Sequence, residues 1–240
     1  MYWKDADLEV ETAARIAEYE QRLGHKVVPP VPLESIAETL FDLTLLYQVI
    51  EEQSGLQILG GLSVAEKTIV INEKHLPEFR AKPGRERFTL AHEIGHWDLY
   101  EQRRSNRQGD FFGGESAKDT RMVCRSAGGL DVKVLKQAWV DDDVHLVESY
   151  LRRKRDDAVE GPAVDRYAAA LLLPKRLLLP AYEPVEVHEW RDLGPLADQF
   201  GVTLSTLSKR LQKMGKLHVR EDGRLFKCSA EEYSGQTSIF

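Results

Sequence analysis

The sequence contains few cysteines and no long apolar segment. Only two of its 240 residues are cysteine, Cys124 and Cys228, which is too few for a disulfide framework. No apolar run approaches the ~20 residues of a membrane-spanning helix, and the polar, acidic N-terminus is unlike a signal peptide. These absences predict a cytoplasmic protein with no membrane partner.

An overall basic character is also missing. The net charge is −6 at pH 7, so the chain as a whole does not attract nucleic acid, and only a local basic patch would do so. Hydrophobic residues make up 42% of the chain and charged residues 30%, as in ordinary globular proteins. A chain of 240 residues has room for one medium-sized domain and a small second unit.

Histidine is scarce, yet two of the seven histidines form the pattern His-Glu-x-x-His at His92, Glu93 and His96. Composition alone would give this pattern in about 2% of such chains. Residues four apart share a helix face, so the two imidazoles are placed to bind one metal ion and Glu93 to take a proton from a metal-bound water. Their neighbours are apolar, where such groups are costly without partners, and Gly95 indicates close packing. We therefore predict one Zn²⁺ ion, with other divalent metals such as manganese left open.

Hydrophobic periodicity and turn residues divide the rest of the chain. They predict helices over residues 8–23, 33–40, 132–139, 144–153 and 165–173, and strands within residues 43–50, 56–62 and 67–72. Zinc peptidases often bind the substrate backbone along an edge strand of a sheet. We predict Thr68–Asn72 as that edge, with a purely structural strand as the alternative.

Two segments resemble the signatures of one known family. Arg87–Trp97 resembles the metal-binding helix of the ImmA/IrrE metallopeptidases. Asp165–Pro174 resembles their second signature, an acidic or amide residue followed by aromatic-Ala-Ala-x-Leu-Leu-hydrophobic-Pro. The resemblance covers about residues 30–215 and is weak between residues 101 and 160.

This resemblance implies an α+β fold in two parts. Residues 1–180 are expected to form a zincin-like, mainly helical peptidase domain with a small β-sheet and a helical insert at about residues 127–158. Residues 181–240 are expected to form a helix-turn-helix-like subdomain.

The resemblance also implies a function. Family members are bacterial or phage zinc-dependent endopeptidases that typically cut a helix-turn-helix repressor once and so derepress stress, phage or defence genes. Such an enzyme can be latent until an activator, for example single-stranded DNA, acts on it. The alternatives are a DNA-binding regulator or a toxin–antitoxin-type binding protein with a non-catalytic metal site.

The third metal ligand departs from the family pattern. The family's glutamate would fall at Gly161, four residues before Asp165, and the nearest glutamate is Glu160. Because a bend at Gly161-Pro162 would bring Glu160 in, it is the predicted third ligand, with Asp165 as runner-up. The more usual role of Asp165 would be to orient a ligating histidine through its free ring nitrogen. Four further acids stay open as ligands: Asp98, Glu148, Asp156 and Asp157.

Two further roles are assigned to named side chains. Cys124 begins a Cys-Arg-Ser element that resembles one found in some family members. As an inhibitory fourth ligand its thiolate would displace the catalytic water, whereas the alternative is a small buried apolar residue. A second electrophile for the tetrahedral oxyanion is expected, and Tyr100 and Tyr167 are the candidates.

The C-terminal segment has a helix-turn-helix pattern. Thr203 is the expected N-cap of its second helix, and the apolar anchors of the two helices are Leu196, Ala197, Phe200, Leu207 and Leu211. A β-hairpin wing is expected over His218–Lys227, with Asp222-Gly223 at its turn. The residues expected to contact nucleic acid or a partner are Lys209, Arg210 and Lys213. So few cations favour substrate docking or scaffolding over nucleic-acid sensing, and sensing over sequence-specific regulation.

Overall fold

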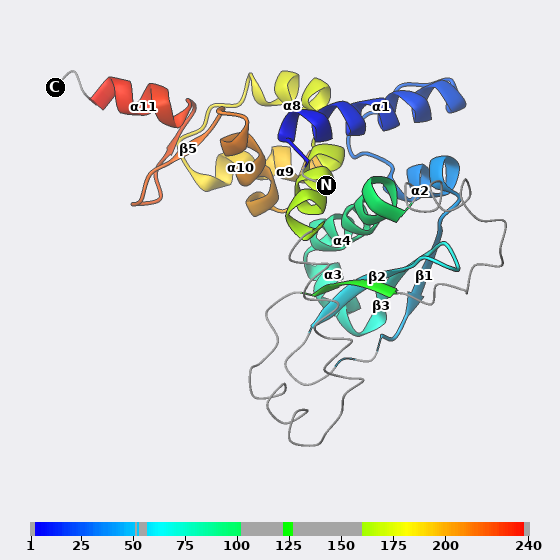
Figure 1. Ribbon diagram of the computed structural model, residues 1–240. Coiled ribbons are helices and arrows are strands. Elements are labelled where there is room, and N and C mark those ends of the chain that lie inside the picture. Colours follow the sequence, from blue (N-terminus) through cyan, green and yellow to red (C-terminus); the bar gives the residue numbers. More distant parts are fainter. Residues whose placement is uncertain (1–2, 51, 53–56, 102–121, 127–159, 238–240) are drawn as a thin grey trace.

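The computed structural model describes residues 3–50, 52, 57–101, 122–126 and 160–237 (Figure 1). These residues form a mixed α+β fold, which confirms the expected class. The helical insert expected at 127–158 lies outside the described residues. Within the described part of the chain, no helix combines the length and apolar character needed to cross a lipid bilayer.

A four-stranded sheet forms the lower arm of the molecule in Figure 1. Its strands run in the order β1-β3-β2-β4, with β1 parallel to β3 and the other neighbours antiparallel. The strand bounds are β1 Thr44–Gln48, β2 Ile58–Ser63, β3 Thr68–Asn72 and β4 Met122–Ser126. The three strands predicted before the histidine motif are therefore present, and β4 was not predicted.

The prediction that Thr68–Asn72 is an edge strand was wrong. This segment is β3, which lies between β1 and β2. Its residues from Ile69 onward are all buried, since a central strand is covered on both faces, and the consecutive apolar residues Ile69, Val70 and Ile71 fit that position. Among the described strands, β1 and β4 are the edges of the sheet.

Helix α4 (Pro83–His96) carries the histidine motif and packs directly on the sheet (Figure 1). Gly60 of β2 makes this approach possible, because a Cβ at that position would lie 2.8 Å from Thr89 Cγ2 of α4 and 3.0 Å from the Val70 carbonyl oxygen. Beyond α4 the chain continues as the π-helical segment η2 (Trp97–Glu101). Such segments inside helices often occur at functional sites.

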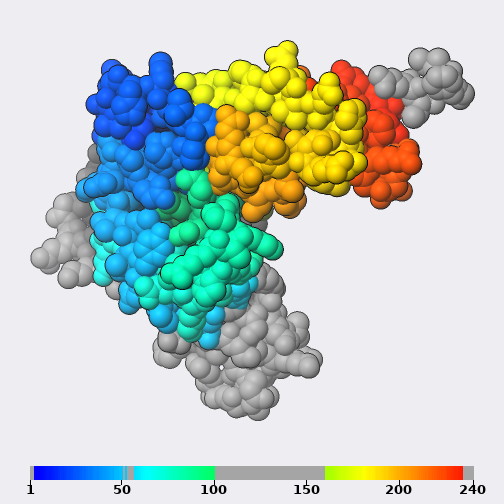
Figure 2. Space-filling view, turned by 180° about the vertical axis from the view of Figure 1, so that it is seen from behind, coloured from blue at the N-terminus to red at the C-terminus, as the bar shows by residue number. Residues whose placement is uncertain are grey.

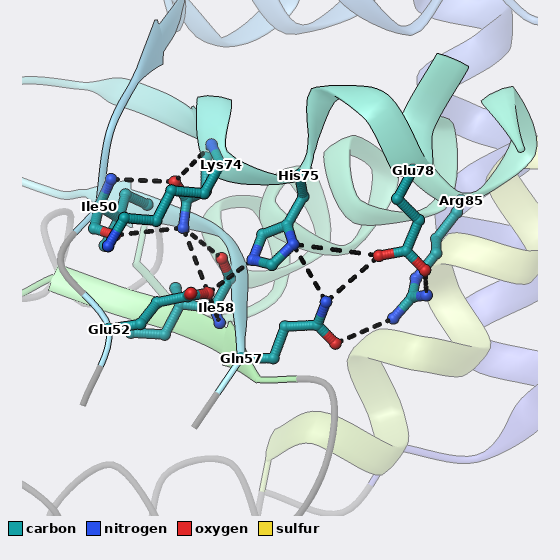
Figure 3. Close-up of polar contacts among 9 residues, drawn as sticks. Ile50, Glu52, Gln57, Ile58, Lys74, His75, Glu78 and Arg85 are labelled. Carbon is teal, nitrogen blue, oxygen red and sulfur yellow. Dashed lines mark hydrogen bonds and ion pairs between the residues drawn. The ribbon is translucent and has the colours of Figure 1, made fainter. Parts of the chain in front are cut away.

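A polar cluster holds the segment before α4 against the end of the sheet (Figure 3). His75 lies between two partners, with its Nε2 2.5 Å from Glu52 Oε1 and its Nδ1 3.0 Å from Gln57 Nε2. Gln57 Nε2 also donates to Glu78 Oε2 at 3.2 Å, and Arg85 of α4 binds Glu78. Burial opposes ionisation of Glu52, but hydrogen bonds from His75 and a backbone N–H outweigh it and lower the pKa of Glu52. The cluster therefore fixes the start of the helix whose end carries the histidines.

Most of the remaining helices form the upper arm in Figure 1. Their bounds are α1 Asp5–Leu23, α2 Leu33–Phe41, α8 Lys175–Tyr182, α9 Gly194–Phe200, α10 Leu204–Lys213 and α11 Ala230–Thr237. Three shorter segments, 3-10 or α-helical, are η1 Glu73–His75, α3 Leu76–Ala81 and η3 Trp190–Leu193. Residues 160–172 are also helical, and this helix ends just before Pro174, as predicted.

Helix α1 packs against the chain that follows residue 174. Glu9 accepts hydrogen bonds from Arg210 of α10, and Glu20 accepts one from Arg176 of α8. Figure 2 shows the blue N-terminal helix directly beside the yellow and orange residues. Burial opposes ionisation of Glu20, but the backbone N–H of Val27 and the side chains of Arg176 and Lys26 outweigh it and lower its pKa to about 2.

The expected C-terminal elements are present. Helices α9 and α10 are joined by a turn at Gly201, whose φ of 61° lies in the left-handed region that glycine tolerates. The Thr203 side chain caps α10 by accepting from the Thr206 N–H at 3.1 Å, as predicted. The strands β5 (His218–Val219) and β6 (Leu225–Phe226) pair antiparallel and form the predicted hairpin.

The apolar core is continuous along the described chain. One cluster of buried side chains reaches from Trp3 through α1, the sheet, α4 and α10 to Leu225. The boundary predicted between residues 180 and 181 falls in the last turn of α8, and the cluster includes Leu178 and Tyr182 on either side of it.

Candidate metal centre

The two motif histidines lie on one face of α4 and point toward each other. Their side chains are buried, and their Nε2 atoms are 3.1 Å apart. Two nitrogens bound to one tetrahedral zinc at 2.0–2.1 Å are about 3.3 Å apart. The histidine pair therefore has the spacing that two ligands of one metal ion require.

Asp165, on the 160–172 helix, fixes the ring of the first histidine. Its Oδ1 lies 2.8 Å from His92 Nδ1. A carboxylate at this nitrogen holds the N–H there and leaves the Nε2 lone pair free to bind a metal. Asp165 thus contacts the ring nitrogen of His92 opposite to the one that faces His96, which is where an orienting carboxylate would lie, and both roles expected of it stay predictions.

Glu160 also reaches the histidine pair. Its side chain is buried, and its Oε2 lies 3.5 Å from His96 Nδ1. It does so from a helix, since residues 160–172 are helical and no bend at Gly161-Pro162 is needed. The contact is with the ring nitrogen other than the one that faces His92. Within the described residues, no set of three acidic, cysteine or histidine side chains meets the geometry of a complete metal site.

Glu93 completes the motif on α4. It directly follows His92, and its side chain is fully buried beside the histidine pair. Two imidazoles at metal-ligand spacing and an adjacent buried carboxylate fit the chemistry of a divalent metal with an acid beside it. The described residues thus supply two donors and the acid, and they do not supply a third donor next to the two Nε2 atoms.

Gly95 lets the 160–172 helix approach the motif. A Cβ at this position would lie 3.0 Å from Tyr167 Cδ1 and 3.1 Å from Val164 Cγ1. The close packing expected at Gly95 is therefore confirmed. This approach brings Asp165 and Glu160 to the two histidines.

A buried network just after the motif was missed by sequence reasoning. Asp98 of η2 is fully buried and binds Arg15 of α1 through three N–O contacts of 2.8 to 3.1 Å. The Tyr167 hydroxyl donates to Asp98 Oδ2 at 2.7 Å. Burial and the adjacent Asp98 charge hold the pKa of Tyr167 well above its usual value. Asp98 was one of the candidate metal ligands, and Tyr167 was a candidate oxyanion stabiliser. Through their contact, and the contact of Asp98 with Arg15, the segment after α4 is held to α1 and to the 160–172 helix.

Several sequence candidates are placed only in part. Cys124 lies on β4, where it is the backbone partner of Gly61 on β2. The position of its thiol is not among the described side chains, so its expected role as a fourth ligand stays a prediction. Glu148, Asp156 and Asp157 lie outside the described residues. Tyr100 lies in η2 and is buried.

The three cations assigned to nucleic-acid or partner contact differ in their surroundings. Arg210 is buried and binds Glu9 and the Leu173 carbonyl oxygen, so its guanidinium has a structural role instead of the expected phosphate contact. Lys213 Nζ lies 3.2 Å from Asp5 Oδ2. Lys209 is exposed and has no ion pair within the described residues.

Comparison with known proteins assigns no family to this chain. No family model matches it, and no curated protein does. Among solved structures, a Mycobacterium tuberculosis transcriptional regulator is similar with a TM-score of 0.46 and 14% sequence identity. The matched region covers 93% of this chain and 55% of that one, so the chain spans about half the length of the regulator.

Proposed function

We propose that this protein is a zinc-dependent endopeptidase with a zincin-like metal helix. The observation that carries the proposal is the pair of Nε2 atoms of His92 and His96, 3.1 Å apart on a buried helix. Asp165 supports it because it holds His92 in the tautomer that binds metal. Bound zinc would make a water acidic enough to attack near neutral pH and would polarise the scissile carbonyl.

Each residue of the proposed active site would have a separate role. His92 and His96 would hold the metal, with Glu160 as the proposed third ligand once its carboxylate turns from His96 Nδ1 toward the two Nε2 atoms. Glu93 would take the proton of the attacking water and pass it to the leaving amine. Asp165 would orient His92. Tyr100 remains the proposed oxyanion stabiliser, since the Tyr167 hydroxyl is bound to Asp98.

The proposed substrate is a helix-turn-helix repressor, which the resemblance to the ImmA/IrrE family implies. The α9–α10 pair and the β5–β6 hairpin would then form the helix-turn-helix-like subdomain that docks this substrate. The buried, paired state of Arg210 favours docking over DNA reading, because a guanidinium held by Glu9 is not presented to a phosphate.

Two measurements test the enzyme proposal. The purified chain should contain about one zinc per molecule by elemental analysis, and His92→Ala should lose it. Metal-loaded protein should cleave the repressor encoded beside its gene, with the activator present, and Glu93→Gln should abolish cleavage while the metal content stays unchanged. Glu86→Gln is the matched control, because Glu86 lies on the same helix and its carboxylate accepts one hydrogen bond from a described residue, the Tyr47 hydroxyl at 2.7 Å.

The outcomes separate the proposal from its rivals. Intact repressor together with full metal content would favour a binding protein of the toxin–antitoxin type. Loss of function on altering Lys209, with no effect of Glu93→Gln, would favour a DNA-binding regulator. A chain without stoichiometric transition metal would refute both the enzyme and its metal site.

A further inference from the structure

A cavity of about 960 Å³ lies where α1, α4, the 160–172 helix and α10 meet. This volume is at the upper end of the range for small-molecule sites, which are typically 300–1,000 Å³ and mostly apolar. Its apolar lining comes from all four elements, with Leu8, Phe88, Ala170 and Leu204, and from Met214 just after α10. A compact apolar group therefore has both the room and the surface that it needs.

The charged side chains around this cavity are mainly positive. Seven lysines and arginines line it, against three carboxylates. Asp5 pairs with Arg166 and Lys213, and Glu9 pairs with Lys175 and Arg210. Each of these two acids is thus shared by two cations, which leaves a local positive excess.

Two of the cations that line the cavity have no acidic partner within the described residues. Lys82, which directly precedes α4, and Lys209 of α10 line the cavity, and neither forms an ion pair within the described part of the chain. Two such charges match one anionic group of charge −1 to −2. They are too few for a nucleic-acid strand, whose binding depends on many phosphate contacts.

The N-termini of two helices also converge here. Thr203 to Thr206, the cap and first turn of α10, line the cavity together with Gly84 in the first turn of α4. A Cβ at Gly84 would lie 2.5 Å from the Val202 carbonyl carbon and 2.6 Å from the Thr203 nitrogen, so the two helix starts touch. Each helix start carries partial positive charge and backbone N–H groups without helical partners. Two helix starts side by side therefore form a surface that favours an anion.

We propose that this cavity binds a small amphiphilic anion, a molecule with an apolar body and one phosphate, sulfonate or carboxylate group. The apolar body lies against Leu8, Phe88 and Met214. The anionic group lies near the start of α10, within reach of Lys209 and Lys82. Binding at this cavity requires neither metal nor peptidase activity.

The test uses two fluorescent probes that differ in one charge. The first is 1-anilinonaphthalene-8-sulfonate, and the second is N-phenyl-1-naphthylamine, which has the same rings without the sulfonate. The full-length protein, folded by circular dichroism, should bind the sulfonate with a saturable fluorescence increase at one site per molecule. The uncharged probe should bind at least about tenfold more weakly.

Three variants locate the bound probe. The double variant Lys82→Ala/Lys209→Ala should weaken sulfonate binding about tenfold and leave the uncharged probe unaffected. Leu204→Asp should weaken it as well, and this change favours folding because an acid stabilises a helix start. Lys216→Ala is the matched control, since Lys216 is exposed on the same part of the chain and does not line the cavity.

Competition distinguishes the two natural sources of such an anion. Displacement of the sulfonate probe by decyl phosphate but not AMP would assign an acyl ligand, and the reverse would assign a nucleotide. Displacement by neither would overturn the proposal. Equal binding of both fluorescent probes, absence of saturable binding, or unchanged affinity in the two cavity variants would also overturn it.

Discussion

Replacing Arg15 with Met should lower the free energy of unfolding by about 3 kcal/mol. The reason is the carboxylate of Asp98, which is fully buried and would lose its only described cationic partner. Removing one member of a buried pair typically costs 3–5 kcal/mol, because the other charge stays buried. The side chain of Arg15 is 24% exposed, which places the cost at the lower end of this range. Methionine keeps the apolar stem of the side chain and so isolates the loss of charge.

The measurement is urea unfolding at pH 7, followed by tryptophan fluorescence. For a chain of this size a loss of about 3 kcal/mol corresponds to a drop in Tm of about 6–12 °C, which a thermal scan would show independently. Arg191→Met is the matched control. Arg191 pairs with Glu189 at 3.1 Å while 80% exposed, so its loss should cost less than about 0.5 kcal/mol. Equal costs for the two variants would refute the account of Asp98.

A second substitution tests the cause and not only the size of the effect. In the Arg15→Met background, Asp98→Asn removes the uncompensated charge and keeps an oxygen for the Tyr167 hydroxyl. The double variant should therefore be more stable than Arg15→Met alone by about 1–2 kcal/mol. Additive losses in the two single variants would show that packing, and not the buried charge, determines the stability.

Three further predictions concern stability. Gly84→Ala should destabilise the protein by about 1–3 kcal/mol in urea unfolding although alanine favours helices, whereas Gly194→Ala, which meets open space, should be neutral or slightly stabilising. Glu20 has its pKa lowered to about 2, so its contribution is complete above its usual value of 4.5 and is lost as the pH falls toward 2. Glu20→Gln should therefore reduce the fall in Tm between pH 5 and pH 2, and an unchanged fall would contradict this pKa. Arg210→Met should cost about 2–3 kcal/mol, because the Leu173 carbonyl would lose its donor and Glu9 would keep only the longer ion pair with Lys175, and a cost near zero would contradict a structural role for Arg210.

Local pattern was sufficient for much of the fold. The apolar periodicity of α1 and α2, the Thr203 cap and the Asp222-Gly223 turn each depend on neighbours within a few residues, and the structure contains all of them. Strand order depends on distant chain segments and could not be derived in this way. One signal was nonetheless available for β3, because Ile69, Val70 and Ile71 are consecutive apolar residues without the alternation of a half-exposed strand, which favours a central strand over an edge.

In the candidate site, too, local contacts were predictable from the sequence and contacts between distant segments were not. The spacing of His92 and His96 follows from helix geometry alone, so their approach was predictable. Arg15 binds Asp98 across 83 positions of the sequence, and no local pattern marks either residue as a partner of the other.

Arg210 shows that burial of a charged residue can be predicted when its helix face is considered. In α10, Leu207 and Leu211 are fully buried, and Arg210 lies three residues after the first and one before the second. Residues three and four apart share a helix face, so Arg210 lies on the apolar side of α10, whereas Lys209 lies on the exposed side. A guanidinium on an apolar face needs a buried acid, and Glu9 of α1 supplies it. The cation of α10 that remains available to a ligand is therefore Lys209, and it lines the cavity in which we propose that the small anion binds.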